Sequence, residues 1–119
     1  MLDHVFVRVR DLEVSDAFYA AALAPLGMAE LMRFPGEIGY GRDGHPWFWV
    51  REGFADDFVH VAFTAPDRPT VDAFHAAALA AGGRDNGAPG LRPHYHRTYY
   101  GAFALDPDGH NVEAVTHVP

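Results

Sequence analysis

The sequence predicts an α+β fold in which two βαβββ units form paired, curved mixed sheets around a cleft. Three observations predict it: the second half of the chain repeats the first, the helical segments are few and rich in Ala, and short alternating strands are separated by Gly and Pro turns. We expect a single domain over residues 1–119, built of two modules at about 1–53 and 54–119.

The repeat is visible without gaps. When the chain is shifted by 56 residues, residues 4–27 fall on residues 60–83, and 12 of these 24 positions are identical. His4 then meets His60, and the run AAALA occurs at the same place in both copies. Ala-rich helices raise such counts, but His, Asp, Phe and Gly positions also match, so we interpret the repeat as an internal duplication.

The first module reads as a strand, a helix and three strands. Residues 2–9 alternate, with Val5, Val7 and Val9 on one face, which we expect to pack against the helices. Asp11 is a helix cap ahead of a helix over residues 14–24. Three further strands are expected near residues 28–34, 37–42 and 46–51, separated by Pro-Gly and Asp-Gly turns.

The second module ends in a turn and a strand, residues 106–115 (DPDGHNVEAV). Glu113 is a charge among apolar neighbours, so a buried Glu113 must be paired, protonated or bound to a metal. The sequence Asp-Gly-His occurs at residues 43–45 and again at 108–110, an offset of 65, and this register makes Phe48 the counterpart of Glu113. We expect the histidines of both turns, His45 and His110, to face solvent.

The offset grows from 56 to 65, so the second module carries extra residues, which we place near residues 84–99. This segment contains His94 and His96, and a lengthened loop rich in His and Tyr is more often functional than a plain connection. Either imidazole is a candidate general base, although a surface histidine is the commoner interpretation for each.

Composition excludes several classes of function. The chain has 9 basic and 16 acidic residues and a net charge of −7, which argues against nucleic-acid or anionic-membrane partners. It has no Cys, so disulfides and a Cys nucleophile are excluded. The N-terminus has no signal-peptide pattern and no apolar run is long enough to cross a membrane, so we expect a cytoplasmic protein that acts on a small molecule.

The two βαβββ halves, the repeated His4 and His60, and the segment 106–115 resemble the vicinal oxygen chelate superfamily. It includes glyoxalase I, extradiol dioxygenases, fosfomycin-modifying transferases and bleomycin-resistance proteins. The resemblance implies a metal site with His4, His60 and Glu113 as ligands and Phe48 at a fourth position that cannot ligate. Two imidazoles and a carboxylate with open positions suit a divalent ion, Fe, Mn, Ni or Zn.

Further candidates surround this site. Arg8 and Phe6 share the strand face of His4, where Arg8 anchors an anionic substrate or forms a structural ion pair. Phe48 and Trp49 contribute aromatic mass to a substrate-binding wall or to the core. Of the neighbouring residues 99 and 100, we expect Tyr100 to point into the cleft as a catalytic group, with packing as the alternative.

Two functions from different classes follow. The first is a small metal-dependent enzyme acting on an oxygen-chelating substrate, an isomerase, a lyase or a dioxygenase. Because Phe48 stands at the fourth ligand position, glyoxalase I itself is the less favoured activity within the superfamily. The alternative is a metal-free protein that binds or sequesters a small molecule, as bleomycin-resistance proteins do. A third and weaker alternative is an interaction module in a larger assembly, and a homodimer is one expected state.

Overall fold

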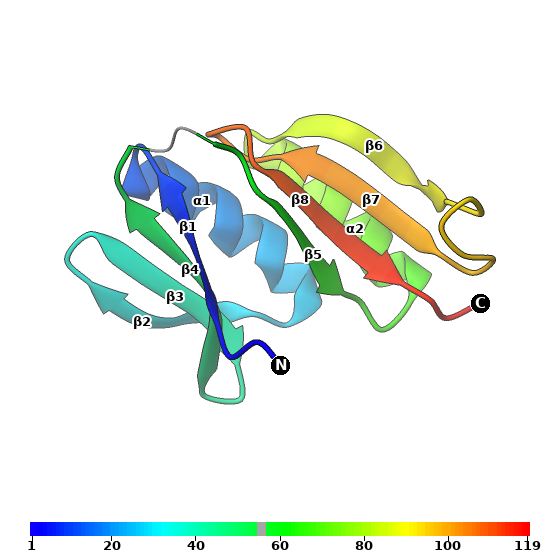
Figure 1. The fold of residues 1–119 in the computed structure, drawn as a ribbon, viewed down its shortest axis with the longest axis horizontal. Helices are drawn as coiled ribbons and strands as arrows, with labels where there is room; N and C mark the ends of the chain where they lie inside the picture. Colours follow the sequence, from blue (N-terminus) through cyan, green and yellow to red (C-terminus); the bar gives the residue numbers. More distant parts are fainter. Residues whose placement is uncertain (55–56) are drawn as a thin grey trace.

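A computed structural model of the chain describes residues 1–54 and 57–119 and contains two four-stranded sheets (Figure 1). The first sheet has the strand order β1-β4-β3-β2 and the second has the order β5-β8-β7-β6. The first half comprises β1 (Val5–Val9), α1 (Leu12–Leu23), the short 3-10 helix η1 (Ala24–Leu26), β2 (Ala29–Phe34), β3 (Glu37–Arg42) and β4 (His45–Glu52). The second half comprises β5 (His60–Thr64), α2 (Arg68–Ala80), β6 (Arg84–Leu91), β7 (Tyr100–Leu105) and β8 (Asn111–Thr116).

This architecture confirms the predicted α+β class and the duplication. In each sheet the first strand pairs in parallel with the last strand of its half, β1 with β4 and β5 with β8, and the remaining pairs are antiparallel. The helix cap predicted at Asp11 also forms, because its carboxylate accepts a hydrogen bond from the Val14 amide at 3.1 Å. Its counterpart in the second half, Asp67, caps α2 in the same way and accepts a hydrogen bond from the Thr70 amide at 2.9 Å.

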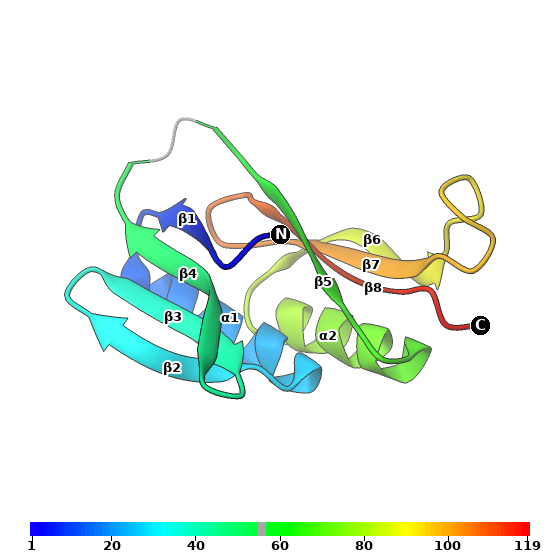
Figure 2. The same ribbon diagram turned by 60° about the horizontal axis from the view of Figure 1, so that its bottom comes forward.

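Both helices lie on the same side of the two sheets, as the two ribbon views show together (Figures 1 and 2). The hydrophobic core lies between the helices and the sheets, because the Ala-rich helices pack closely on the sheets and α1 also packs on α2. Val7 and Val9 are fully buried there, as the alternation in the sequence predicted. The opposite faces of both sheets are left without a helix, and these faces carry most of the candidate site residues.

The register predicted for Phe48 was wrong by one residue. Phe6 pairs with Trp49 in the first sheet, whereas Ala62 pairs with Glu113 in the second, so Trp49 is the true counterpart of Glu113. Phe48 instead points to the helix side, where it is 1% exposed and its ring lies 4.8 Å from that of Tyr19. The fourth position beside the expected metal is therefore occupied by Trp49, which has no ligating group either.

The turn before β8 ties the two halves together, and we call residues 106–110 the inter-module clamp. Asp106 is 1% exposed; its carboxylate accepts hydrogen bonds from the Tyr19 hydroxyl at 2.5 Å and from the amides of Asp108 and His110 at 2.9 and 2.8 Å. Burial, and then the charge and hydrogen bond of Asp106, raise the pKa of Tyr19 well above its ordinary value. Tyr19 lies on α1, so this network crosses between the halves.

His110 completes the clamp, and the expectation that it faces solvent was wrong. Its ring is 1% exposed and spans the two halves: Nε2 lies 2.8 Å from the carbonyl oxygen of Arg8, and Nδ1 accepts a hydrogen bond from the Val59 amide at 3.1 Å. Because one ring nitrogen donates and the other accepts, the imidazole is neutral in this arrangement. A proton on Nδ1 would remove the acceptor that the Val59 amide uses.

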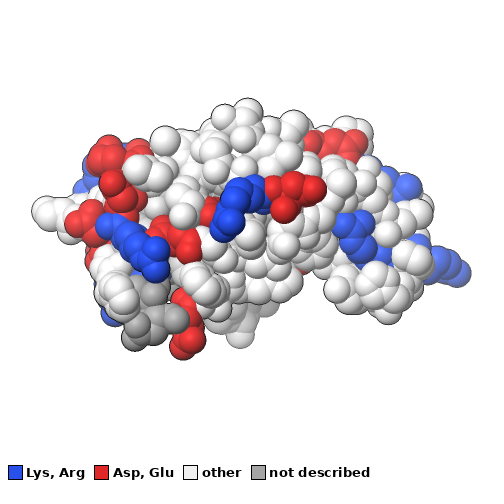
Figure 3. Space-filling model, turned by 90° about the horizontal axis from the view of Figure 1, so that it is seen from above, with Lys and Arg blue, Asp and Glu red and all other residues white. Residues whose placement is uncertain are grey.

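No helix in the described part of the chain is long and apolar enough to cross a membrane. On the face in Figure 3, acidic and basic side chains lie close together over the half that holds the first sheet. Basic side chains mark the opposite end, where the β6–β7 connection lies in Figure 1. Arg92, the first residue of that connection, borders the candidate site.

Candidate functional site

Glu113 lies at the centre of the helix-free face of the second sheet, on β8. It is 1% exposed, and its two oxygens have separate partners: Oε1 lies 2.9 Å from Nε2 of His60, and Oε2 accepts a hydrogen bond from the Tyr99 hydroxyl. A carboxylate accepts hydrogen bonds, so the His60 proton sits on Nε2 and Nδ1 is left as an acceptor. The buried charge predicted from the sequence is thus paired.

Tyr99, rather than Tyr100, points to this face. Tyr99 stands just before β7, and Gly101 makes room for its contact with Glu113, since a Cβ at Gly101 would lie 3.1 Å from Glu113 Oε2. Burial and then the hydrogen bond to Glu113 raise the pKa of the Tyr99 phenol above its ordinary value. Tyr99 therefore stays protonated near neutral pH and acts as a donor.

Tyr100 faces the other way, so its expected orientation was wrong. Its hydroxyl donates to Oδ1 of Asp72 on α2 at 2.7 Å, and the Arg68 guanidinium lies 5.1 Å from its ring centroid. Alternation along β7 explains this, because Ala102 and Ala104 share the parity of Tyr100 and are fully buried against the helix. A catalytic role for Tyr100 on the face of Glu113 does not fit this geometry.

A groove of about 460 Å³ opens beside His60, the partner of Glu113, and we call it the second-sheet groove. Phe103 forms its apolar wall, with its ring centroid 5.9 Å from that of His60. Arg92 lies over the same Phe103 ring at 5.5 Å and donates to the carbonyl oxygen of Ala88 at 2.8 Å. The remaining lining residues are Asn86, Gly87, His94, Tyr95 and Asn111.

The connection between β6 and β7, residues 92–99, borders this groove. It is shorter than predicted, because β6 extends to Leu91 and takes up the first half of the expected loop. His94 lines the groove and its ring contacts Tyr95 at 4.2 Å between centroids. His96 does not line it: Nδ1 of His96 accepts a hydrogen bond from the Thr98 amide at 3.2 Å, and its ring lies 5.7 Å from His117.

His4 lies apart from His60 and Glu113. Its Nδ1 is 2.7 Å from Oδ1 of Asp3, its side chain is 48% exposed, and it lines a different hollow, between the two halves. Among residues 1–54 and 57–119, no three His, Asp or Glu side chains lie together in a way that would hold a metal ion. In one chain, therefore, only His60 and Glu113 among the expected ligands are close enough together to bind the same divalent ion. The expected site had a third ligand, His4.

The helix-free face of the first sheet is aromatic. Trp49 stacks between Phe6, at 5.3 Å, and Phe34, at 6.1 Å between ring centroids. The Arg51 guanidinium lies 4.3 Å from the Phe6 centroid. Arg8 lies at the far end of β1 from His4, in a hollow with Phe6, so it is not beside His60 and Glu113. These predicted substrate-binding residues therefore form a surface of their own.

Sequence reasoning missed Tyr99, the partner of Glu113, and two groups that line the second-sheet groove: Arg92 and the amide pair of Asn86 and Asn111. The amide of Asn86 donates to Oδ1 of Asn111 at 3.1 Å, which joins β6 to β8 across the groove. A signal for Tyr99 was present in the sequence. Small residues at 102 and 104 mark the helix side of β7, and Tyr99 has the opposite parity.

The chain belongs to the Glyoxalase/Bleomycin resistance protein/Dioxygenase superfamily, whose family model matches residues 1–114. This confirms the family expected from the repeat and from the segment 106–115. Comparison with curated protein sequences gave no match.

Solved structures with the same fold include a glyoxalase/bleomycin resistance protein from Albidiferax ferrireducens T118, which is 32% identical over 97% of both chains with a TM-score of 0.82. A glyoxalase I mutant from Zea mays is 26% identical, with a TM-score of 0.70, over 96% of this chain and 45% of that chain. The fosfomycin resistance protein FosX from Mesorhizobium loti is 20% identical over 98% of this chain and 91% of that chain, with a TM-score of 0.71, and it shows the shared fold alone.

Proposed function

We propose that this protein binds a small molecule with an anionic oxygen group in the second-sheet groove. The observation that carries the proposal is the lining of the groove, where His60, which is held by buried Glu113, lies together with Arg92 and Phe103. Arg92 offers a guanidinium fork to an anion, and Phe103 offers an apolar wall to the rest of the molecule. Such a site has the mixed lining that small-molecule pockets have in general.

The binding proposal does not require a metal. His60 and Glu113 would supply two ligands to an ion, but His4 lies in another hollow. A site with all three ligands therefore requires a different arrangement of the two halves, or the His4 of a second copy of the chain. The metal-free small-molecule binder, the alternative considered from the sequence, is therefore better supported by the geometry of one chain than the metal-dependent isomerase, lyase or dioxygenase.

Calorimetric titration with phenylphosphonate, which joins a ring to an anionic group, tests this proposal. Arg92→Gln should weaken binding roughly 10- to 100-fold, because a charge-assisted hydrogen bond contributes about 1.5–3 kcal/mol. Arg84→Gln is a matched control, since Arg84 begins β6, the strand that ends just before Arg92, and does not line the groove. Equal affinities of the two variants, or equal weakening in both, would contradict the proposal.

A second candidate function is proton transfer to or from the bound molecule. The observation that favours it is the orientation of His60 by Glu113: with its proton on Nε2, His60 has Nδ1 free as a base. Glu113 would stabilise the imidazolium that forms, and Tyr99 would hold the second carboxylate oxygen.

Exchange of the α-hydrogens of pyruvate in D₂O, followed by NMR, tests this second candidate. His60→Gln should slow the catalysed exchange by roughly 10²- to 10⁴-fold, the usual contribution of a general base. Tyr99→Phe should slow it less, because Glu113 keeps its contact with His60. If His60→Gln exchanges pyruvate as fast as the unmodified protein, His60 is not the base.

A further inference from the structure

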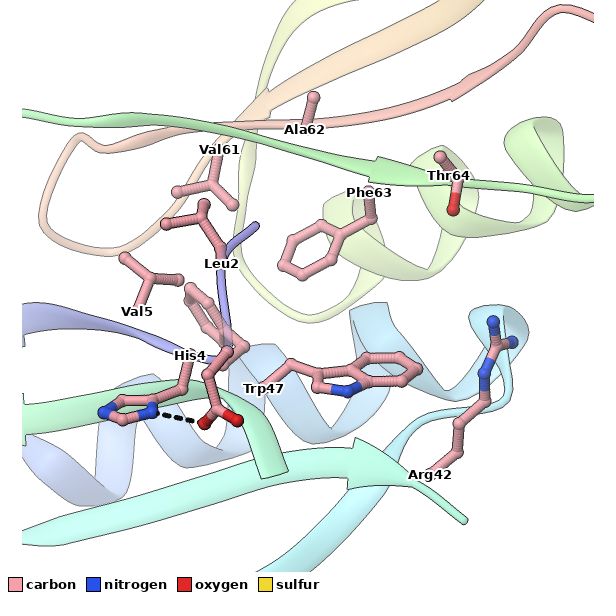
Figure 4. Close-up of a pocket in the computed structure, with 11 residues that line it drawn as sticks. Leu2, His4, Val5, Arg42, Trp47, Val61, Ala62, Phe63 and Thr64 are labelled. Atoms are coloured by element: carbon pink, nitrogen blue, oxygen red, sulfur yellow. Dashed lines mark hydrogen bonds and ion pairs between the residues drawn. The ribbon is translucent and has the colours of Figure 1, made fainter. Parts of the chain in front are cut away.

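A second hollow lies between the two halves, away from the second-sheet groove, and we call it the inter-module groove. Strands β1 and β5 are the facing edges of the two sheets, and within the described residues each pairs only with the last strand of its own half. The clamp joins the halves at one end of these strands. At the other end a groove of about 320 Å³ opens between the start of β1, the start of β4 and the strand β5 (Figure 4).

The walls of the inter-module groove are mostly apolar. Phe63 points into it, with its ring edge-on to buried Phe48 at 5.3 Å between centroids. Val61 and Trp47 are half-buried and line the same space. A second hollow of about 220 Å³ shares Trp47 and Phe63 with it and extends to Met28 and Leu26. The apolar surface is thus long enough for an extended chain or a ring.

One cation stands at the rim of both hollows. Arg42 lies 5.3 Å from the Trp47 ring centroid, and its Nη1 donates to the carbonyl oxygen of Leu26 at 3.2 Å. In the described ranges no carboxylate pairs with Arg42, whereas Arg33 and Arg51 each form ion pairs. An arginine that is oriented by a ring and a carbonyl, and still has N–H donors to spare, is suited to bind a carboxylate.

We propose that the inter-module groove binds an amphipathic monocarboxylate, whose carboxylate pairs with Arg42 and whose apolar chain lies against Phe63 and Trp47. The Thr64 hydroxyl lies along the same wall as a further polar contact (Figure 4). The groove has the size of a small-ligand pocket and shares no lining residue with the second-sheet groove. The two sites are therefore separable by experiment.

The other end of the groove disfavours a second acid group. Asp3 lines it, with Oδ1 at 2.7 Å from Nδ1 of His4. An aspartate carboxylate carries a negative charge near neutral pH and repels a distal carboxylate. Octanoate should consequently bind more tightly than octanedioate, which has the same chain length and acids at both ends.

Titration of the full chain with octanoate, by calorimetry and by tryptophan fluorescence, tests the proposal. Arg42→Gln should weaken binding roughly 10- to 100-fold, and Arg42→Lys should weaken it less. Arg84→Gln, at a residue that lines neither groove, should bind octanoate as the unmodified protein does, and Arg92→Gln detects any binding in the second-sheet groove. The fluorescence response should be lost in Trp47→Phe and kept in Trp49→Phe, because only Trp47 lines the groove.

Octanamide serves as the neutral comparison and should bind at least tenfold more weakly than octanoate. The proposal is overturned if octanamide binds equally well, if folded Arg42→Gln keeps full affinity, or if octanoate does not bind below its micelle-forming concentration. Weakening by Arg92→Gln instead of Arg42→Gln would place octanoate in the second-sheet groove and also overturn it. Circular dichroism of each variant establishes that Arg42, an exposed residue, is replaced without loss of the fold.

Discussion

Removing the Asp106 carboxylate should open the inter-module clamp and cost a large part of the stability of the protein. Asp106→Ala takes away the acceptor of three hydrogen bonds and leaves the buried Tyr19 hydroxyl and the His110 amide without a partner. An unsatisfied buried donor costs about 1–3 kcal/mol. The amide of Asp108 is only half-buried and can turn to water, so two donors decide the sum, and we expect a loss of roughly 3–5 kcal/mol.

Such a loss is large against the 5–15 kcal/mol that typically stabilises a domain. Urea denaturation followed by circular dichroism measures it. Tyr19→Phe should cost less, about 1.5–3 kcal/mol, because it removes one bond to a charged group and leaves Asp106 its two amide donors. Asp108→Ala in the same turn is the control; its contacts, to the exposed Arg10 amide at 2.9 Å and to the Ser15 hydroxyl at the long distance of 3.4 Å, should contribute less than about 1 kcal/mol.

The reasoning is refuted if Asp106→Ala is no more destabilising than Asp108→Ala. A double-mutant cycle between Asp106 and Tyr19 adds a second check. Two residues that share a buried hydrogen bond should show a coupling energy of about 0.5–3 kcal/mol. A coupling near zero would mean that the hydroxyl finds another partner in the variant.

Three further results are expected. His4→Ala should retain as much divalent metal as the unmodified protein, since His4 lies apart from His60; metal analysis that shows a loss would place His4 in the same coordination sphere. Above pH 10 the free energy of unfolding should fall, because buried Tyr19 keeps its proton in the folded state and loses it in the unfolded state; Tyr19→Phe should reduce the slope of this loss by up to about 1.4 kcal/mol per pH unit in alkaline denaturation. Gly39→Ala should destabilise by about 1–3 kcal/mol in urea, because a Cβ at Gly39 would lie 2.8 Å from the Trp49 ring; an unchanged midpoint would show that the ring moves freely.

The sequence was sufficient for the duplication, the element order and the helix caps, because these depend on local patterns that both halves share. The register of β4 could not be predicted from the sequence, because the two Asp-Gly-His turns are of different lengths. Arg42 pairs with His45 across a turn of two residues, whereas Leu105 pairs with Asn111 across a turn of five. Aligning the shared letters therefore superposed unlike turns and moved Phe48 onto the wrong face.

The candidate site, too, was predicted only in part. Glu113 and His60 were found from the repeat and from the resemblance to the superfamily, and both lie within one half, on the paired strands β5 and β8. Whether His4 joins them depends on how the two halves are placed relative to each other, and no periodicity in the sequence specifies that. The clamp fixes the placement of the two halves through Asp106 and His110, which bond to residues far from them in the sequence.

The position of the clamp in the chain also bears on the order of folding. The contacts by which it joins the two halves link residues separated by 87 to 102 positions, from Tyr19 with Asp106 to Arg8 with His110. Closing so long a segment carries a large entropic cost before any contact repays it, and contacts of high sequence separation slow folding. During synthesis, Tyr19 on α1 therefore has no Asp106 acceptor until nearly the whole chain has been made.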